Sequence, residues 1–564
     1  MPERVPDSAP AAAATGDAAD PYQREKQTFP TLSDEQIARA KEYGEVESMA
    51  AGTVLFERGQ RAVDFFLVLS GNVEIFDLGA DGEANVFTVH RERQFTGELD
   101  LFNGRKILVG GRTGADSEIL RVPRNRFQKM VSAETDIGEK IMRAFILRRT
   151  AFLVHDQAGV IVFGEPNGAD TLRIRRFLSR NGYPYHFVDS GADGARDELP
   201  DGAEIDPERL PAIVRPNEAV LHAPSTPELA DALGLTEPLD EDHVYDLAVV
   251  GAGPSGLSAA VYAASENLDT VVVEQEAPGG QAGTSSRIEN YLGFPTGISG
   301  QALAGRAWIQ SQKFGARFAV SRAVASIDCD ARPFRIVLED ERTLRARAVV
   351  IASGATYRTL DVDGYERYEG QGIHYAATAI EAQLCVGEEV IVVGGGNSAG
   401  QAAVFLSRHA SHVHVLVRGE TLASSMSDYL VRRIDSSSRI TLHTNTEIAA
   451  LHGERLLERV SWIKGEEEET REVGNVFVMI GAVPNTGWLE GCVELDERGF
   501  VRTGLDVGDG DKRPSSPFTS SVEGIYAVGD VRSGSVKRVA SGVGEGSVCI
   551  QSVHRWLAEH GEDG

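Results

Sequence analysis

Short apolar runs separated by glycine and aspartate turns fill the first quarter of the chain. Residues 30–125 contain five of them, in the segments TVLFERG, DFFLVLSG, NVEIFDLGADG, ANVFTVH and SEILRVP. This spacing predicts the strands of a small all-β roll or barrel. Between 124 and 154 the turn residues largely disappear, and apolar side chains recur at helical spacing, at Ile141, Phe145, Ile146 and Leu147. We therefore expect a roll that ends in a long helix, an arrangement that often joins two subunits of a homodimer.

The pattern then alternates between strand and helix. Apolar runs at 159–164, 185–190 and 210–214 predict strands. An amphipathic segment at 171–182 ends in Asn-Gly and predicts a helix, and a shorter helix is expected at 226–235. An acidic connector, TEPLDEDH, leads to residue 243. The segment 156–236 is therefore expected to form a small α/β domain of its own.

Two later segments repeat one plan. Residues 245–276 and 388–420 each read as an apolar strand, a glycine-rich turn, a helix and a second strand. This is the pattern of a dinucleotide-binding βαβ unit, and the chain carries it twice.

Composition and charge narrow the function classes. The chain has 564 residues, enough for three or four domains, and a formal net charge of −28. A surface with this much negative charge would repel phosphate backbones and anionic lipids. We therefore expect neither a nucleic-acid nor a membrane partner. The first 25 residues are rich in Ala, Pro and Asp and predict a disordered tail, not a secretory signal. No apolar run approaches the length of a membrane span.

The cysteines are few and scattered. Cys329, Cys385, Cys492 and Cys549 include no C-x-x-C pair and do not look like a disulfide framework. This usage fits a reducing cytoplasm, where we expect the protein to reside.

The first glycine-rich turn has the chemistry of a phosphate site. Gly251, Gly253 and Gly256 follow an apolar strand and open a helix. Without side chains there, backbone N–H groups can approach a pyrophosphate at the helix N-terminus. Glu274 closes the next strand, where a carboxylate can accept hydrogen bonds from ribose hydroxyls.

The second turn differs at the matching strand end. Gly394, Gly396 and Ala399 form the turn, and Arg418 stands where the first unit has its glutamate. A guanidinium can bind a 2′-phosphate that a carboxylate would repel. This favours NADPH, with NADH as the alternative if Arg418 is only a surface charge.

Residues 244–560 resemble the thioredoxin reductase family of FAD-dependent oxidoreductases. The resemblance rests on GAGPSG, PGGQ, IENYLGFPTGISG, ASGA, GGGNSA, GIYAVGDV and SVKRVASGVGEG. It implies an FAD-binding domain at 244–360 and 486–560 and an NAD(P)H-binding domain at 361–485. The implied FAD residues are Gly251, Gly253, Pro254, Ser255, Gly256, Glu274, Gln275, Gly280, Gln281, Asn290, Val324, Gly354, Gly529, Asp530, Lys537, Arg538 and Val539. The implied nicotinamide-nucleotide residues are Gly394, Gly396, Asn397, Ser398, Ala399 and Arg418.

One departure from this family concerns electron transfer. Ala376 and Ala379 stand where the family has its redox C-x-x-C, and a methyl group cannot form a mixed disulfide. We therefore expect no internal relay from flavin to disulfide, and we assign no catalytic residue. Cys385 is expected to be a small buried hydrophobe, and Glu381 an exposed structural residue that could otherwise supply a proton near the flavin.

The N-terminal region, over 26–155, is similar to a cyclic-nucleotide-binding domain. The segments GTVLFERGQRAVDFFLVLSGNVEIF and FTGELDLFNG carry the likeness, which implies a ligand site at Gly97, Glu98 and Leu99. The family's phosphate-binding arginine falls at Ile107, and Arg105 or Lys106 would need a change of register. The ligand is therefore either a cyclic nucleotide or another small molecule, and the third alternative is a dimerising scaffold. No helix-turn-helix follows.

The middle segment, 157–236, resembles a thioredoxin-like domain. LPAIV matches the cis-proline stretch at Pro211, but EPNGAD stands where the redox cysteines belong. We expect a domain without redox activity.

The fold class expected from these features is multi-domain: a β-roll with a long helix, an α/β thioredoxin-like middle domain and a C-terminal α/β flavoprotein with two dinucleotide-binding domains. The expected function is an NAD(P)H oxidoreductase that uses FAD and NADPH, binds no metal and passes electrons to an external acceptor, a small redox protein or a small molecule. The N-terminal ligand is a candidate regulator of this reaction. The alternatives are a ligand-sensing flavoprotein with little turnover, a ferredoxin or flavodoxin–NADP reductase, and a thioredoxin-disulfide reductase.

Overall fold

The computed structural model describes residues 24–561 apart from 79–83, 156–157, 201, 216–217, 286–287, 289, 369–370, 376, 378, 423–425, 455, 509–513 and 515. The chain divides into two compact units, Met1–Pro166 with Asn181–Pro238, and Asn167–Arg180 with Leu239–Gly564. All but the last two residues of the expected N-terminal tail, 1–25, lie outside the described residues. Within the described residues, no helix combines the length and apolar character needed to cross a membrane.

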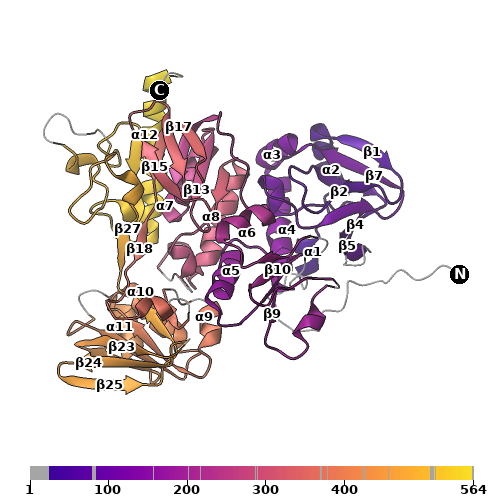
Figure 1. Ribbon diagram of the computed structural model, residues 1–564. Helices are drawn as coiled ribbons and strands as arrows, with labels where there is room; N and C mark the ends of the chain where they lie inside the picture. Colours follow the sequence, from indigo (N-terminus) through magenta and orange to yellow (C-terminus); the bar gives the residue numbers. More distant parts are fainter. Residues whose placement is uncertain are drawn as a thin grey trace. The chain divides into compact units, whose positions relative to one another are not determined.

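The first unit begins with the expected roll (Figure 1). One sheet has the order β1-β7-β3 and the other β2-β6-β4-β5, with all neighbours antiparallel. Two strands, β1 and β6, were not among the five apolar runs. The bounds are β1 (Glu45–Met49), β2 (Val54–Phe56), β3 (Phe65–Ser70), β4 (Asn72–Leu78), β5 (Ala84–Arg91), β6 (Gly110–Thr113) and β7 (Ser117–Val122). Two short helices precede the roll, α1 (Glu25–Thr28) and α2 (Asp34–Ala40).

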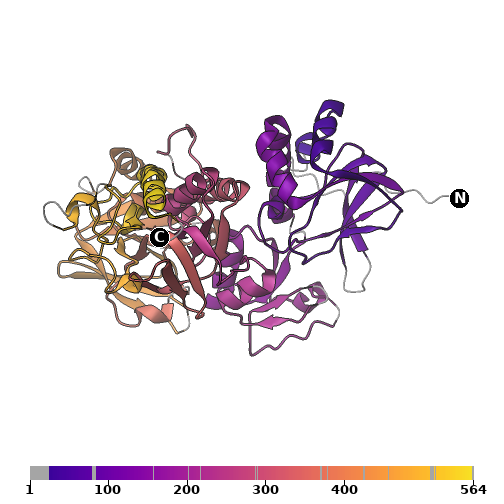
Figure 2. The ribbon, with the colours of Figure 1, turned by 90° about the horizontal axis from the view of Figure 1, so that it is seen from above.

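The helix expected over 124–154 is in fact two helices, α3 (Arg124–Ala133) and α4 (Thr135–Val154) (Figure 2). The break falls at Glu134, whose carboxylate accepts hydrogen bonds from Arg39 Nη1 at 2.6 Å and Tyr43 Oη at 3.2 Å. These long-range bonds hold Glu134 out of helical geometry.

The stripe on α4 was only partly right. Ile141 and Phe145 are fully buried in an aromatic core with Phe65 and Phe127, whereas Ile146 is 37% exposed. The buried face of α4 therefore runs through Ile141 and Phe145 and continues in the next turn with two consecutive buried arginines, Arg148 and Arg149.

A four-stranded sheet of order β11-β10-β8-β9 follows in the first unit. β8 and β9 are parallel, and β10 is antiparallel to both β8 and β11. The Leu210–Pro211 peptide bond is cis, where the thioredoxin-like resemblance expects a cis proline. The Ser225 side chain caps the following helix, in a reciprocal pair with Glu228. The bounds are β8 (Val160–Gly164), β9 (Tyr185–Asp189), β10 (Ala212–Val214), β11 (Leu221–His222) and α6 (Thr226–Leu233).

The second unit contains a seven-stranded sheet of order β14-β13-β12-β17-β16-β15, with β28 also paired to β17. The strand β12 reads VYDLAVV and is parallel to both of its neighbours, which suits a nearly continuous apolar run. The bounds are β12 (Val244–Val250), β13 (Thr270–Glu274), β14 (Arg317–Val320), β15 (Val324–Asp328), β16 (Phe334–Leu338), β17 (Thr343–Ile351) and β28 (Ile525–Ala527).

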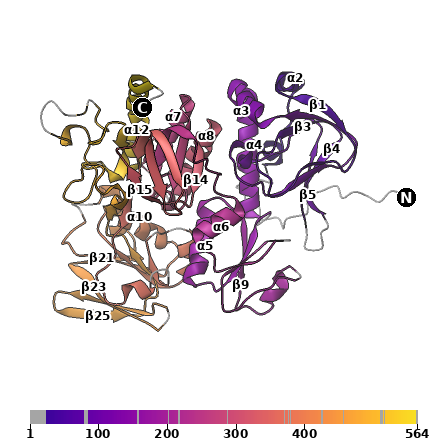
Figure 3. The ribbon, with the colours of Figure 1, turned by 45° about the horizontal axis from the view of Figure 1, so that its top comes forward.

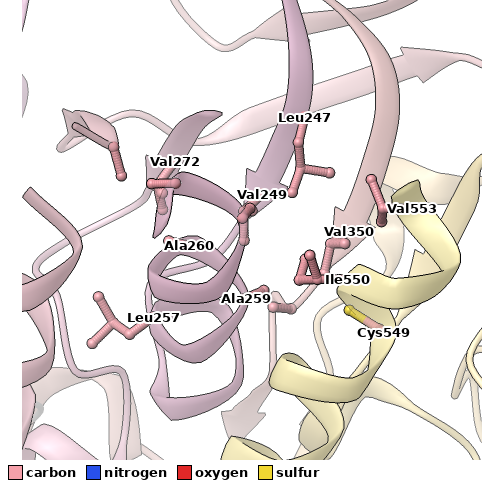
Figure 4. Close-up of a cluster of buried hydrophobic side chains, with 14 of the residues drawn as sticks. Leu247, Val249, Leu257, Ala259, Ala260, Val272, Val350, Cys549, Ile550 and Val553 are labelled. Atoms are coloured by element: carbon pink, nitrogen blue, oxygen red, sulfur yellow. The ribbon is translucent and has the colours of Figure 1, made fainter. Parts of the chain in front are cut away.

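Two helices from opposite ends of the second unit's sequence pack side by side against this sheet (Figure 3). They are α7 (Pro254–Ser265) and α12 (Val539–His560), and α8 (Gly300–Lys313) lies next to α7. Figure 4 shows their shared core, in which Ala259 of α7 and Ile550 of α12 meet Val350 of β17. Because Gly546 of α12 has no side chain, the two helices can approach closely at Ser255 and Ser258.

A second parallel sheet, of order β19-β26-β20-β21-β22, contains the other glycine-rich turn. The pair β18–β27 and a β23-β24-β25 meander complete the unit, with the helix α5 from the preceding segment. The bounds are β18 (Ala355–Tyr357), β19 (Ile373–His374), β20 (Glu389–Val393), β21 (His412–Val417), β22 (Ile440–Thr444), β23 (Thr446–His452), β24 (Arg459–Lys464), β25 (Glu467–Arg471), β26 (Val476–Val478), β27 (Ala482–Pro484), α5 (Ala169–Arg180), α9 (Ala379–Leu384), α10 (Asn397–Leu406) and α11 (Asp428–Asp435).

The expectation that the cysteines form no disulfide is wrong. Cys329, after β15, and Cys492 form a disulfide across a sequence separation of 163, with their Cα atoms 5.7 Å apart. Cys385 and Cys549 are reduced and buried. No local pattern predicts this pairing, because the two half-cystines meet only when β15 packs against the segment near Trp488.

We expect reduction of the Cys329–Cys492 bond to lower the free energy of unfolding of the second unit by about 2–4 kcal/mol, because the bond closes a long loop in the unfolded chain. Thiol titration of denatured protein should find two thiols before and four after dithiothreitol treatment. Thermal unfolding should shift downward with reductant in the native protein but not in Cys329→Ser/Cys492→Ser. Four thiols in the untreated protein would contradict the bond.

Candidate functional site

The first glycine-rich turn leaves open space in front of a helix. Gly251 follows β12 with φ +102°, a conformation that favours glycine, and α7 begins at Pro254. Gly253 caps α7 in extended geometry, and a Cβ built there would meet no atom within 4 Å. The first N–H groups of α7 therefore face a space that an anion can enter.

Glu274 stands beside this turn at the end of β13. The residue is 8% exposed, and its carboxylate accepts hydrogen bonds from the backbone N–H groups of Ala252 at 2.7 Å, Glu276 at 3.0 Å and Ala277 at 3.3 Å. Burial raises the pKa of Glu274, and the backbone hydrogen bonds oppose that rise. The side chain is thus fixed as an acceptor next to the turn.

A cavity of about 1110 Å³ opens in front of the first glycine-rich turn and extends to the start of the helix that follows the second turn. Its size suits a dinucleotide-like cofactor. Most of the predicted FAD residues line it: Gly251, Gly253, Pro254, Ser255, Glu274, Gln275, Gly280, Gln281, Asn290, Val324, Gly354, Asp530, Lys537, Arg538 and Val539. Gly256 and Gly529 do not line it; they lie behind it, where a Cβ would collide with the Gly251 backbone and the Ser255 side chain, respectively.

The second turn reaches the same cavity only at its helix. Asn397 and Ser398, at the start of α10, line the cavity, and Asn397 Oδ1 accepts a hydrogen bond from Ser427 N at 2.7 Å. Gly394, Gly396 and Ala399 shape the turn without lining this cavity. Arg418 follows β21, is exposed, and lies outside the cavity lining.

The C-terminal part supplies a half-buried acid, Asp530. Burial raises the pKa of Asp530, which lines the cavity, while Lys537 lowers it. Lys537 Nζ also donates a hydrogen bond to the Asp530 backbone carbonyl at 3.0 Å. Behind them, Glu545 of α12 accepts hydrogen bonds from Gly529 N at 2.7 Å and Arg532 Nη2 at 2.7 Å, and so fixes the loop.

Some cavity residues were missed by the sequence reasoning. Tyr375, Trp488 and Arg322 line the cavity, although none belongs to a glycine-rich turn. No local pattern marked them, because each reaches the cavity through the folding of a distant loop.

The region where a redox C-x-x-C was expected departs from the prediction in one respect. Glu381 was predicted to be exposed, but the structure buries it, with only 1% of the residue exposed. Its carboxylate accepts hydrogen bonds from Arg176 Nη2 at 2.8 Å and Nε at 3.2 Å. Cys385 is fully buried, as predicted, and burial raises the pKa of its thiol to about 12. Ala376 lies outside the described residues, and Ala379 begins α9.

A second candidate site lies inside the roll of the first unit. Gly97, Glu98 and Ile107 line a hollow there, whereas Leu99 packs against the roll core. The Glu98 carboxylate accepts hydrogen bonds from Arg149 Nε at 2.9 Å and Asp100 N at 3.2 Å.

Neither basic neighbour of Ile107 points into this hollow. Arg105 is buried and donates a hydrogen bond to the Asn181 carbonyl at 3.3 Å, and Lys106 donates one to the Ala232 carbonyl at 3.4 Å. The change of register considered from the sequence does not occur.

Comparison with known proteins agrees with the presence of two glycine-rich turns. The model of the pyridine nucleotide-disulphide oxidoreductase family matches residues 245–546. The chain belongs to this family. The cyclic nucleotide-binding domain model matches residues 46–134.

Thioredoxin reductases are among the relatives within the pyridine nucleotide-disulphide oxidoreductase family. The thioredoxin reductase of Bacillus subtilis (strain 168) is 32% identical over 325 residues, which are 57% of this chain and 97% of that protein. The crystal structure of Lactococcus lactis thioredoxin reductase aligns with a TM-score of 0.51 and 26% identity, over 56% of this chain and 99% of that one. The crystal structure of T. acidophilum thioredoxin reductase aligns with a TM-score of 0.50 and 30% identity, over 57% of this chain and 100% of that one.

The family assignment fixes the general chemistry. The protein is an NAD(P)H-dependent flavin oxidoreductase with a thioredoxin reductase-like fold, it uses FAD and a nicotinamide nucleotide, and it carries an N-terminal cyclic nucleotide-binding domain.

Proposed function

We propose that this protein oxidises NADPH and delivers the electrons to a separate acceptor, a small redox protein or a small molecule, without an internal dithiol. The observation that carries the proposal is the cavity lined by the first glycine-rich turn and by the start of α10, the helix that follows the second turn. Among the described residues that line this cavity there is no cysteine. The residues that would replace a redox dithiol in sequence are Ala376 and Ala379.

The residues present fit FAD. The open space at Gly253 leaves room for a pyrophosphate against the N–H groups of α7, and Glu274 can accept hydrogen bonds from ribose hydroxyls. Asp530 would orient the ribityl chain. When bound, FAD supplies a two-electron acceptor for hydride from NADPH. The protein binds, orients and shields the reacting groups, with 244–360 and 486–560 holding FAD and 361–485 holding NADPH.

The described cysteines do not offer a substitute relay. Cys385 and Cys549 are buried, and burial raises the pKa of both thiols, so neither supplies a thiolate at neutral pH. Cys329 and Cys492 do not line the cavity. Electrons would therefore leave directly to a molecule that reaches the cavity, where Tyr375 and Ala377 form part of the lining.

We expect the purified protein to absorb near 450 nm and to bleach when NADPH is added without oxygen. The reduced protein should then reoxidise with a ferredoxin, a flavodoxin, a quinone or oxygen, but reduce thioredoxin little or not at all. Absence of flavin or of bleaching would overturn the oxidoreductase proposal. Rapid, stoichiometric thioredoxin reduction would overturn only the proposed exit.

Arg418 is proposed to select NADPH over NADH. We expect Arg418→Ala to lower kcat/KM for NADPH by about ten- to a hundredfold, because a charge-assisted hydrogen bond to the 2′-phosphate contributes about 1.5–3 kcal/mol. The value for NADH should stay within about twofold. Arg432→Ala is the matched control, since Arg432 is an exposed arginine of the same domain, paired with Asp428. An equal loss with both nucleotides would exclude the assigned role.

A further inference from the structure

An arginine enters the roll hollow from the helix side. The hollow has a cavity volume of about 50 Å³, and most of its lining is aromatic or aliphatic, including Phe56, Phe87 and Phe152. Arg148 of α4 also lines the hollow, and this residue is only 5% exposed. A cation in such surroundings is costly unless it is paired.

Arg148 is only partly satisfied by the protein. Its Nε donates a hydrogen bond to the Thr28 carbonyl at 3.0 Å, and its Nη1 donates one to the Gly97 carbonyl at 2.8 Å. Its Nη2 is buried and has no hydrogen-bond partner within the described part of the chain. The guanidinium also lies 4.9 Å from the centre of the Phe95 ring. The bonded partners are neutral carbonyls, so no carboxylate among the described residues forms an ion pair with Arg148.

Glu98, the nearby carboxylate, is committed elsewhere. It forms a buried ion pair with Arg149, the next residue of α4, which also bonds Asp100. Burial lowers the pKa of Arg148 to about 9 and the charge of Glu98 opposes that shift, so the guanidinium is still charged at neutral pH. The hollow therefore keeps a net positive group.

Two further polar atoms of residues that line the hollow are also buried without a hydrogen-bond partner among the described residues. These atoms are His90 Nδ1 and Thr96 Oγ1. Burial, and then the charge of Arg148, lowers the pKa of His90 well below its ordinary value, so the ring is neutral. The lining thus offers one charged and two neutral polar atoms without a partner among the described residues, in otherwise apolar surroundings, which suits a ligand with one anionic head.

A cyclic nucleotide fits these residues poorly. Ile107 presents an aliphatic side chain where a phosphate partner would be needed, and Glu98 would have to leave Arg149 to meet a ribose hydroxyl. The positive charge in the hollow comes instead from Arg148, which lies on the helix α4. We propose that the roll binds a small monocarboxylate with an apolar body, whose carboxylate pairs with Arg148 and whose body fills the aromatic part of the hollow.

Calorimetric titration of the full-length holoprotein tests this assignment. The probes are benzoate and hexanoate, with benzamide as the neutral analogue, acetate as the head without a body, and cAMP and cGMP. We expect benzoate or hexanoate to bind one per chain, and benzamide and acetate to bind at least about tenfold more weakly. Equal affinity for benzoate and benzamide, tighter binding of a cyclic nucleotide, or no carboxylate binding at about 1 mM would overturn the proposal.

Variants locate the site. Arg148→Met should weaken the binding of the carboxylate probe by about ten- to a hundredfold, and the exposed Arg143→Met on the same helix should leave it unchanged. If Arg148→Met fails to fold by circular dichroism, Arg148→Lys keeps the charge but not the planar fork and should weaken binding less. Unchanged affinity in either folded Arg148 variant would overturn the site, whatever the flavin activity of the same preparation.

Discussion

Gly253→Val is expected to produce a folded protein that loses at least about a hundredfold in FAD affinity. Gly253 has φ −68°, which valine adopts without strain, and a Cβ there meets no protein atom within 4 Å. The added side chain would occupy the space in front of α7. Two lost hydrogen bonds from N–H groups to the charged pyrophosphate, at about 1.5–3 kcal/mol each, account for that factor.

Gly305→Val is the matched control, because a Cβ at Gly305 of α8 also meets nothing within 4 Å and Gly305 does not line the cavity. Absorbance measures the flavin that each variant retains after desalting, and circular dichroism shows whether the variant is folded. Full flavin content in Gly253→Val would show that the cofactor does not approach the first turn.

Arg149→Leu is expected to destabilise the first unit by about 3–5 kcal/mol. Arg149 lies between Glu98 and Asp100, and the change leaves two buried carboxylates without their cation. Burial, together with the charge of Asp100, raises the pKa of Glu98 and the charge of Arg149 lowers it, so the substitution removes the group that favours the ionised carboxylate. For a unit of this size the melting temperature should fall by roughly 6–20 °C.

Differential scanning calorimetry of the holoprotein measures this change, while flavin fluorescence reports separately on the second unit. Arg143→Leu is the control, since Arg143 sits on the same helix in an exposed pair with Glu139. A shift below about 2 °C in Arg149→Leu would mean that the two carboxylates are protonated or solvated in the native protein.

The parts of the site that sequence could predict are those with local causes. A glycine-rich turn needs only the strand before it and the helix after it, and Glu274 ends the following strand, so spacing alone places these residues together. The same reasoning found β12 and β20, because strands buried on both faces must be continuously apolar.

The parts that sequence could not predict depend on partners far along the chain. Glu381 was expected at the surface, but it is buried against Arg176, 205 residues earlier. Cys329 and Cys492 likewise pair across 163 residues. Arg148 did leave a signal, since it follows Ile141 and Phe145 at helical spacing on the buried face of α4.

The flavoprotein sheet also constrains the order in which the protein can be made. Its last strand, β28, and the helix α12 come from the final forty residues of the chain, yet they pair with β17 and pack on α7. During synthesis, the first turn and its helix emerge from the ribosome long before the elements that cover them. The half-built sheet must wait with only the end of β17, residues 349–351, unpaired on one side, and with the face of α7 that α12 will cover exposed. FAD capture is therefore expected only after β28 and α12 have been synthesised, and chains that end before residue 524 should remain without flavin.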